Sequence, residues 1–388
     1  MRIKAIDVLR LKRPAPEGPR TPARRPPWTH DSEVANPMSR FPEVKRHRGL
    51  WMPRWEGVWV KVTAEDGTYG LASCSFGRPV AAVIADHFAP NLVGQEALAI
   101  ERLWDMMFRM SKPYGTVGLA SVAISGVDLA LWDLAGKLQG RPVYELLGGK
   151  VRDRAFAYAT GNDIDWYMEL GFRAVKLACP YGPVDGLWGL DENEKLVART
   201  RELVGDDVEI MLDCYMAFDV DYTVRLAERL RPYRLKWIEE YLIPEDMDGH
   251  VAVRQRLPWQ TLATGEHMYT PWPFQQMISR RAVDILQPDI HWVGGLTACR
   301  RIAEMADSAG LTVMLHGGGT HPYGQHLTLS MPSMPWAECF IGSAPGVPLD
   351  EVDWTPGTVA PRDGWVTAND GPGFGIDMPE EWFEPFFA

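Results

Sequence analysis

The sequence predicts an α/β protein built around a (β/α)-type barrel. Two observations predict it: short apolar strands alternate with helices between residues 155 and 341, and a polar residue ends most of these strands. About eight strand–helix units in succession are typical of a closed parallel barrel more than of an open doubly wound sheet. No glycine-rich dinucleotide fingerprint follows any early strand, which further disfavours the open sheet.

Length, composition and charge bound the kind of protein. The 388 residues, 46% of them hydrophobic, can bury a large core. A net charge of −11 does not indicate nucleic acid or an anionic membrane as a partner. Five cysteines without CxxC spacing argue against a disulfide framework and a structural zinc site. With no signal-peptide pattern and no apolar run near membrane-spanning length, we expect a soluble cytoplasmic protein.

Residues 1–150 predict an α+β domain. Residues 1–10 alternate like a strand, and a second strand at 59–63 enters a hairpin turn at Glu65-Asp66-Gly67. From about 81 to 140 the apolar spacing is helical, and the last helix is apolar on most of its surface. This half therefore differs from the barrel that follows it.

A Pro- and Arg-rich stretch at about 11–57 separates the first two strands. Its few apolar repeats predict a long excursion and not a packed element. Two interpretations stay open: a disordered surface loop, or a mobile flap that brings cations and His30 over an anionic ligand.

The barrel is expected over residues 151–345, with helices at 191–204, 219–231 and 295–309 between several of its strands. Residues 346–388 contain no further strand–helix unit and are expected to return to the first domain. The predicted strands are Ala155–Thr160, Ala174–Ala178, Glu209–Asp213, Leu235–Glu239, Thr261–Glu266, Val283–Asp289, Thr312–His316 and Trp336–Ile341.

Three carboxylates, Asp213, Glu239 and Glu266, close consecutive predicted strands after residues that should be buried. Strand ends meet on one face of a parallel barrel, so we expect these side chains to converge. Buried acids are costly unless they are paired or bind a metal, and an all-oxygen set suits Mg²⁺. A single such acid would more often be a helix cap or an ion-pair partner, but three at barrel spacing favour the metal.

Asp289, His316 and Glu338 continue the same series, and all six polar residues follow one another at intervals of 22 to 27 residues. An aspartate beside His316 would fix its tautomer and raise its basicity, as a general base requires. A lone histidine at a strand end is more often structural. The glycines after His316 allow close approach of a ligand and favour the catalytic interpretation.

These residues resemble the enolase superfamily, of the mandelate racemase/muconate lactonizing enzyme kind. The resemblance runs from about residue 115 to the end and is carried by DLALWDLAGK, PVYELLGG, strands ending in MLD, WIEE and TGE, QPDIHWVGGLT and PGFGID. Many members have DAN after the third strand, where this chain has Asp213-Cys214-Tyr215-Met216. Together with NPMSRF, GEH and HGGG, that difference resembles the L-rhamnonate dehydratase group.

The resemblance implies an α+β capping domain, formed by the N-terminal part and the C-terminal tail, over a modified (β/α)8-type TIM barrel, (β/α)7β. It implies Mg²⁺ on Asp213, Glu239 and Glu266, with Glu240 outside the ligand set. It also implies a His316–Asp289 pair and a protonated Glu338 beside the substrate carboxylate. Substrate contacts in the group come from the flap, where His30, Arg46 and Arg48 are candidates; the group's usual histidine before the NPMS-like segment has no clean counterpart.

The expected activity is that of a hydro-lyase in sugar acid catabolism. His316 would remove the proton α to a carboxylate, and loss of the 3-hydroxyl would leave a 2-keto-3-deoxy acid. Either His316 or His267 could protonate the leaving hydroxyl. We expect L-rhamnonate as the leading sugar-acid substrate, no nucleic-acid or membrane partner, and a homo-oligomer.

Two alternatives stay open. A racemase or epimerase needs a second base on the opposite face of carbon 2, which in related enzymes is the second lysine of a KxK motif. This chain has only the first, in Lys176-Leu177-Ala178, although Lys176 itself could reach the site. The other alternative is a non-catalytic, Mg²⁺-dependent sugar-acid binder.

Overall fold

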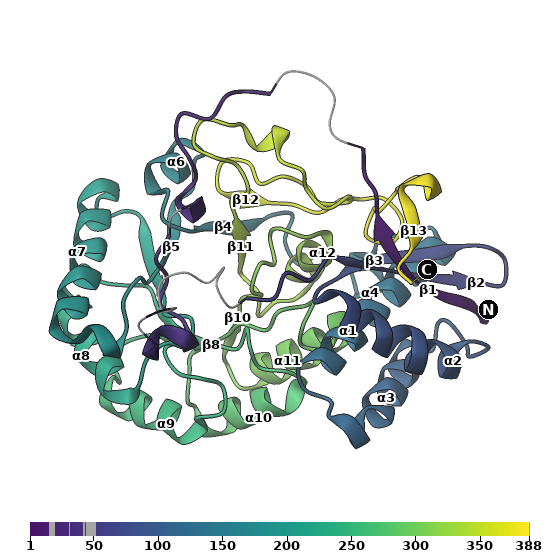
Figure 1. Ribbon diagram of the computed structural model, residues 1–388, viewed down its shortest axis with the longest axis horizontal. Coiled ribbons are helices and arrows are strands. Elements are labelled where there is room, and N and C mark those ends of the chain that lie inside the picture. Colours follow the sequence, from purple (N-terminus) through teal and green to yellow (C-terminus); the bar gives the residue numbers. More distant parts are fainter. Residues whose placement is uncertain (15–19, 31, 42, 44–51, 388) are drawn as a thin grey trace.

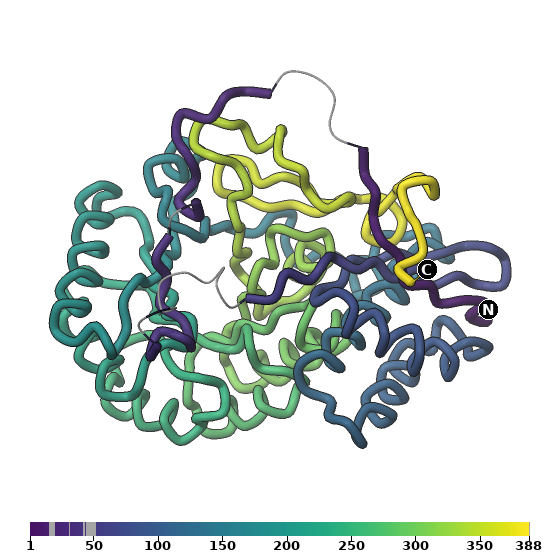
Figure 2. Tube along the Cα trace, in the orientation of Figure 1, coloured from purple at the N-terminus to yellow at the C-terminus, as the bar shows by residue number. Residues whose placement is uncertain are grey.

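The computed structural model describes residues 1–14, 20–30, 32–41, 43 and 52–387. Figure 1 shows a large part, in which helices surround a curled sheet, beside a smaller part that holds both chain ends. Figure 2 follows the chain as a tube and shows the N-terminal segment leaving the smaller part and crossing to the larger one. The predicted fold class, a modified barrel with an α+β capping part, is confirmed.

The capping part is built on a four-stranded antiparallel sheet in the order β13-β1-β2-β3. Its strands are β1 (Ile3–Leu11), β2 (Val58–Ala64), β3 (Tyr69–Cys74) and β13 (Phe383–Pro385). Strands β2 and β3 form the predicted hairpin. The helical segments of this part are α1 (Gly77–Ala82), η4 (Val83–Phe88), α2 (Ala89–Leu92), α3 (Ile100–Met110), η5 (Lys112–Tyr114), α4 (Leu119–Gln139) and α5 (Val143–Leu146).

Helix α4 lies against the sheet of the capping part, with Gly70 of β3 at the closest approach. A Cβ at Gly70 would lie 2.1 Å from the carbonyl oxygen of Ala130, so only glycine fits between strand and helix. The helix has the length and mean hydropathy, 1.4, of a membrane span, which corrects the expectation that no segment comes near one. However, 94% of its most apolar window is buried inside the protein, as in the core helix of a globular fold.

The larger part contains a sheet in the order β10-β9-β8-β7-β6-β5-β4-β11, with neighbouring strands parallel along the whole path. The last of these strands in sequence, β11, pairs with the first, β4, which curls the sheet toward a barrel. The strands are β4 (Ala155–Thr160), β5 (Ala174–Ala178), β6 (Glu209–Asp213), β7 (Ile238–Glu239), β8 (Leu262–Thr264), β9 (Ile285–Leu286), β10 (Thr312–Val313) and β11 (Trp336–Phe340).

Helices cover the outside of this curled sheet (Figure 1). Several begin at side-chain caps: Asp219 accepts from the Tyr222 amide at 2.8 Å, and Asp246 accepts from the Gly249 amide at 2.9 Å. The helices are α6 (Ile164–Glu169), α7 (Gly186–Val204), α8 (Val220–Leu230), α9 (Met247–Arg256), α10 (Pro271–Arg280), α11 (Gly295–Ser308) and α12 (Pro322–Ser330). Short 3₁₀ segments are η1 (Trp28–His30), η2 (Pro37–Arg40), η6 (Pro183–Asp185), η7 (Arg231–Tyr233), η8 (Leu349–Glu351) and η9 (Glu380–Trp382).

The predicted bounds of β4, β5 and β6 are confirmed, whereas β7 to β10 are shorter than predicted. The chain still runs alongside its neighbours there, since Lys236 donates its amide to Ile210 and Asp284 donates its amide to Leu262. Only the regular β-ladder of hydrogen bonds between these strands is shorter than predicted. Glu266 therefore lies two residues beyond the end of β8 and not within the strand.

Described residues between Thr21 and Ala35, in the stretch 11–57, contact the barrel part, whereas Leu11 and Glu56 at its ends contact β13 and β1 of the capping part. The Thr21 hydroxyl donates to the Glu351 carboxylate at 2.6 Å, Arg24 pairs with Glu169 at 2.7 Å, and the Ala35 amide donates to Cys179 at 2.8 Å. Figure 2 shows this segment passing over the barrel. That the stretch acts as a mobile flap remains a prediction.

The C-terminal residues contact both parts. Strand β13 pairs with β1 in the capping sheet, while β12 (Trp365–Val366) pairs antiparallel with β4 of the barrel. The predicted return of residues 346–388 to the first domain thus agrees with the β13 pairing, and the tail also borders the barrel. The exact domain limits at 150 and 345 remain a prediction.

His250 is a buried histidine of α9 that packs against Tyr241, with ring centroids 5.0 Å apart. Burial lowers the pKa of His250 to about 4, and the nearby Asp246 only partly offsets this. In an unfolded chain the imidazole would titrate near 6.5. As the pH falls below 6.5, the unfolded chain therefore binds a proton that the folded protein does not.

We accordingly expect the free energy of unfolding to fall as the pH falls from about 6.5 toward 4. His250 alone should account for a loss of roughly 1 kcal/mol between pH 7.5 and 5.5. In His250→Gln that part of the loss should vanish, as measured by urea unfolding at both pH values. Tyr241→Phe is the control, and it should change stability equally at the two pH values. An unchanged pH dependence in His250→Gln would contradict the prediction.

Candidate active site

Asp213, Glu239 and Glu266 converge at one end of the barrel, as predicted. One carboxylate oxygen from each lies within 4.8 Å of the others. Asp213 and Glu239 are the last residues of neighbouring parallel strands and pair directly in the ladder. Buried apolar residues precede both, so the backbone cannot turn these acids out to solvent.

The ammonium group of Lys176, on β5, balances the charge of this cluster. It forms ion pairs with Glu239, with Glu338 at 2.7 Å and with Asp213 at 3.5 Å, and it is fully buried. Burial opposes the charge of Lys176, but the carboxylates outweigh it and raise its pKa. The remaining oxygen of Glu239 accepts hydrogen bonds from Trp237 at 2.8 Å and Gln287 at 2.6 Å.

The cluster carries more negative charge than this single lysine neutralises. Burial raises the pKa of Glu239 to about 7 and that of Glu266 to about 8, and neighbouring carboxylates contribute to both shifts. Like charges in a site of low dielectric repel strongly. Three carboxylate oxygen donors at this spacing, two of them from buried residues, fit a hard divalent cation such as Mg²⁺, which would relieve that repulsion.

A second group of possible ligands lies beside the first: Glu240, Glu266 and His267. Glu240 directly follows Glu239 and has a left-handed backbone (φ 48°). Its carboxylate accepts from the His267 amide at 3.3 Å and pairs with His267 Nδ1 at 2.9 Å. This bond leaves His267 Nε2 directed toward Glu266, 3.9 Å away.

His316 and Asp289 form the predicted pair. The Nδ1 atom of His316 lies 2.7 Å from Asp289 Oδ2, and Asp289 Oδ1 accepts from the His291 amide at 2.6 Å. His316 Nε2 is 3.2 Å from Glu266. Burial disfavours the charged imidazole, but Glu266, Asp289 and Glu338 raise the pKa of His316 to about 10. A cation on Glu266 would remove part of that effect, because it would neutralise the carboxylate.

Glu338 lies within β11 and is fully buried. It accepts hydrogen bonds from the Thr160 hydroxyl and, at 2.9 Å, from the Gly317 amide. Burial opposes its charge, but Lys176 and His316 outweigh this and lower the pKa of Glu338. The lowered pKa favours the ionised form of Glu338, and the protonated Glu338 expected at the substrate carboxylate stays a prediction.

A cavity of about 550 Å³ lies at this end of the barrel, and Asp213, Glu266, His267 and His316 are part of its lining. The other described lining residues are mostly apolar. They come from the N-terminal segment, the capping part and the barrel loops, and include Trp28, Val34, Met38, Phe76, Trp292 and Phe340.

The remaining predicted site residues do not line the cavity or lie outside the described residues. Lys176 lies beneath the carboxylates and does not line the cavity. His30 is exposed in η1 and is not among the cavity-lining residues. Arg46 and Arg48 lie outside the described residues. Their roles in substrate binding remain predictions.

Sequence reasoning missed several residues that shape the site. The Tyr215 amide donates to Asp213 at 2.9 Å, and the Trp292 ring lies 5.3 Å from both His267 and His316. Gln287 and Trp237, which hold Glu239, could have been found: each lies two residues before a predicted site residue, and side chains two apart in a strand share one face.

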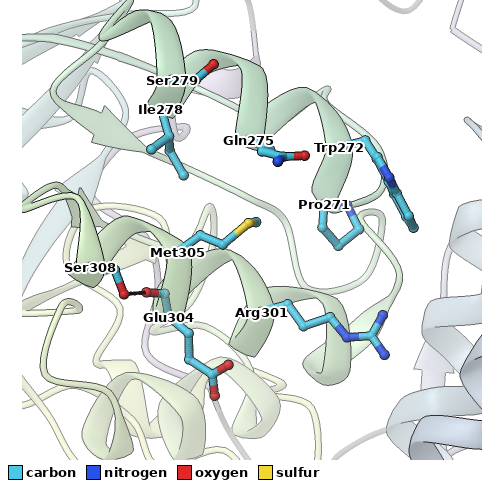
Figure 3. A pocket seen from close by; sticks show the side chains of 9 residues that line it. All are labelled: Pro271, Trp272, Gln275, Ile278, Ser279, Arg301, Glu304, Met305 and Ser308. Atoms are coloured by element: carbon cyan, nitrogen blue, oxygen red, sulfur yellow. Dashed lines mark hydrogen bonds between the residues drawn. The ribbon is translucent and has the colours of Figure 1, made fainter.

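A second hollow, of about 710 Å³, lies between α10 and α11 on the outside of the barrel. Figure 3 shows Pro271 and Trp272 on one side of it and Met305 and Arg301 on the other. Its acid and base do not form a reactive set, because Arg301 pairs with Glu101 and the Glu304 carboxylate lies 3.7 Å from Arg300. The catalytic interpretation therefore applies to the smaller cavity.

Comparison with known proteins agrees with this geometry. Residues 162–382 match the family described as "Enolase C-terminal domain-like", and residues 52–148 match the "Mandelate racemase / muconate lactonizing enzyme, N-terminal domain". The chain belongs to the enolase superfamily. As an enolase superfamily member it has both of that family's domains in the usual order.

Three relatives illustrate its place in the superfamily. An L-rhamnonate dehydratase of Saccharopolyspora erythraea is 38% identical over 356 residues, covering 90% of each chain. A rhamnonate dehydratase of Gibberella zeae complexed with Mg has a TM-score of 0.90 at 32% identity, covering 99% of this chain and 96% of that one. A racemase of Streptomyces coelicolor with bound magnesium has a TM-score of 0.78 at 26% identity, covering 97% of each.

The two neighbouring sets of possible metal ligands can be told apart by substitution. We expect Glu239→Gln and Glu266→Gln to weaken Mg²⁺ binding by at least about tenfold, because each removes a charged ligand. Glu240→Gln is the matched control and should bind Mg²⁺ nearly as well as the unmodified protein. Calorimetric titration with MgCl₂ measures the three affinities. Loss of binding in Glu240→Gln, with Glu239→Gln unaffected, would assign the metal to the other group.

Proposed function

We propose that this enzyme is a Mg²⁺-dependent acid-sugar dehydratase, a hydro-lyase that converts L-rhamnonate or a close analogue into its 2-keto-3-deoxy acid. The observation that carries the proposal is the His316–Asp289 pair beside three converging carboxylates in one cavity. The L-rhamnonate dehydratases among its relatives support the reaction and the substrate class.

Asp213, Glu239 and Glu266 would hold the cation. When bound, Mg²⁺ supplies positive charge that stabilises the negative charge developing on the substrate carboxylate as the α-proton leaves. The acidity of that proton is otherwise too low for a histidine to remove it at neutral pH. Lys176, fixed beneath the cluster, adds permanent positive charge close to the same carboxylates.

His316 would take the α-proton on Nε2, the ring nitrogen that is free of Asp289. Asp289 accepts a hydrogen bond from Nδ1, and this selects the tautomer whose Nε2 is the base. The Asp289 carboxylate is itself oriented by the His291 amide. The imidazole ring therefore has little freedom to rotate, which favours proton transfer in one direction.

The 3-hydroxyl must gain a proton to leave as water. Two histidines that line the cavity could donate this proton. His316 carries one after the first step, and His267 presents Nε2 toward Glu266 while Glu240 holds its Nδ1. If His316 serves both steps, the proton and the hydroxyl leave from the same face of the sugar acid. Water leaves, and the enol product tautomerises to the 2-keto acid.

The apolar part of the cavity supports a sugar acid that is not polar along its whole length. Met38 and Phe76 contribute a thioether and an aromatic ring to the cavity lining. L-Rhamnonate ends in a methyl group, whose burial against such side chains is favourable. A monoacid with a deoxy end is therefore the best match to the described lining.

The racemase alternative has weaker support. Lys176, the residue that could have acted from the opposite face, is held by Glu239 and Glu338 under the cavity and does not line it. The neighbouring racemase from Streptomyces coelicolor is 26% identical, below the identity with the dehydratases. The binder alternative is disfavoured by the intact His316–Asp289 hydrogen bond.

The proposal includes a cytoplasmic location and assembly into a homo-oligomer. The five cysteines are free and buried, as suits a protein of the reducing cytoplasm. Exposed apolar side chains on the capping part and on α10, such as Val117 (64% exposed) and Trp272 (46% exposed), support assembly into a homo-oligomer.

The reaction is tested by incubating the enzyme and MgCl₂ with a panel of mono- and diacid sugars and measuring 2-keto acid formation. We expect L-rhamnonate to be turned over. It should be preferred over L-mannonate, which adds one hydroxyl at carbon 6, by roughly ten- to a hundredfold in kcat/KM. The same reaction run in D₂O separates the two activities. Recovery of the C2 epimer carrying deuterium would assign racemase activity to the enzyme and contradict the dehydratase proposal.

The base is tested by His316→Asn. This change should lower 2-keto acid formation and exchange of the α-proton in D₂O by at least about a hundredfold, since a general base contributes that much or more. Calorimetry should still detect Mg²⁺-dependent binding of L-rhamnonate, because the ligand carboxylates are intact. Unchanged exchange in this variant would assign the base to another residue, His267 first.

A further inference from the structure

Asp163, in the loop after β4, has an unusual environment for its position. It occupies the N-cap position of α6, where an aspartate commonly accepts hydrogen bonds from the first helical amides, yet it makes no such bond. Its side chain is only 3% exposed. A buried carboxylate is costly without partners, so the residues that bind Asp163 should tell what it is for.

Among the described residues, the two that hydrogen-bond to the Asp163 side chain come from the N-terminal segment. The Arg25 guanidinium donates to Oδ1 and forms an ion pair with it, and the Trp28 amide donates to Oδ2 at 2.9 Å. Arg25 also pairs with Asp165 at 2.5 Å, but that carboxylate is 53% exposed. Asp163 is thus a fixed, buried anchor on the barrel for a segment 135 residues earlier in the chain.

The Trp28 side chain packs against the barrel next to Tyr167 of α6. Its indole nitrogen and the Tyr167 hydroxyl both border Gly161, at the end of β4, where a Cβ would lie 2.3 Å from each. Gly161 has φ 131°, a conformation that glycine tolerates best. Barrel residues therefore shape the place that Trp28 occupies.

Trp28 also lines the cavity above the carboxylates. We propose that Asp163 is a positioning residue that fixes Trp28 as a wall of the substrate cavity, and that Trp28 determines how tightly the acid sugar is held. The proposal rests on the dehydratase function argued above. An indole face can cover the apolar C–H surface of a sugar chain, and a fixed ring loses little freedom when it does so.

The proposal separates binding from chemistry. Asp163 touches neither the carboxylate cluster nor the His316–Asp289 pair, so its loss should leave the reacting groups in place. A wall that contacts the substrate equally in the ground state and the transition state changes KM and not kcat. Damage to the barrel as a whole would instead lower kcat together with the stability of the protein.

The test measures kcat and KM for the acid sugar that the unmodified enzyme dehydrates fastest. Asp163→Asn, Arg25→Gln and Trp28→Ala should each raise KM about tenfold and leave kcat within about twofold. Asp165→Asn, which removes the exposed partner of the same arginine, is the matched control and should leave KM nearly unchanged. Trp28→Phe keeps an aromatic wall and should recover most of the affinity lost in Trp28→Ala.

A double variant tests whether Asp163 acts through Trp28. If Asp163 acts through Trp28, then adding Asp163→Asn to Trp28→Ala should raise KM no further, whereas independent effects would multiply. Should Asp163→Asn fail to fold, the surface change Arg25→Gln in both Trp28 backgrounds carries the same test. An unchanged KM in the folded single variants, or multiplying effects, would overturn the proposal. No 2-keto acid from any sugar with the unmodified enzyme would instead overturn the proposed function, and this inference with it.

Discussion

The burial of several carboxylates at one end of a barrel is the constraint on which the rest of the site depends. Asp213, Glu239 and Glu266 cannot separate, because each is attached to the end of a strand packed between neighbours. Their mutual repulsion in a site of low dielectric must be offset by positive charge. Lys176 supplies part of it from below, and the open side of the cluster is left for a divalent cation and a substrate carboxylate.

The capping part and the barrel each supply what the other lacks. The barrel provides charged groups on rigid strand ends, while the N-terminal segment and the capping part provide the apolar walls, such as Trp28 and Phe76. Buried polar contacts join the two parts, as where Thr297 of α11 donates its amide and hydroxyl to Asp128 of α4. Reacting groups can thus stay fixed while the walls differ between members, which suits a fold that serves several reactions.

The arrangement of the possible bases fits the elimination proposed for this chain. His316 is oriented by Asp289, and His267 is oriented by Glu240. Trp292 lies against both imidazole rings and holds them as separate groups. The lysine that could have served a second face is tied to the carboxylates beneath the cavity. In the proposed reaction the α-proton taken by His316 is followed by loss of the 3-hydroxyl, and Lys176 is not among the described cavity-lining residues that could act as an opposing base.

The sequence by itself determined the elements and the reacting groups. Strand bounds were predicted correctly for β4 to β6, because short apolar runs are local signals, joined in β6 by a closing acid. The regular spacing placed Asp213, Glu239 and Glu266 on one face, since parallel strands end together. Local patterns carry no information on where regular strand pairing ends in β7 to β10. The strands predicted there were therefore too long.

Only the tertiary structure decided which charges meet and how they balance. The pairing of Lys176 with Glu338, which lowers the pKa of that acid, joins residues far apart in sequence whose side chains share the barrel interior. The contact of Trp28 with Asp163 likewise depends on where a long, irregular segment crosses the barrel. Such contacts follow from packing in three dimensions, because neither residue type nor spacing specifies the path of a segment without periodicity.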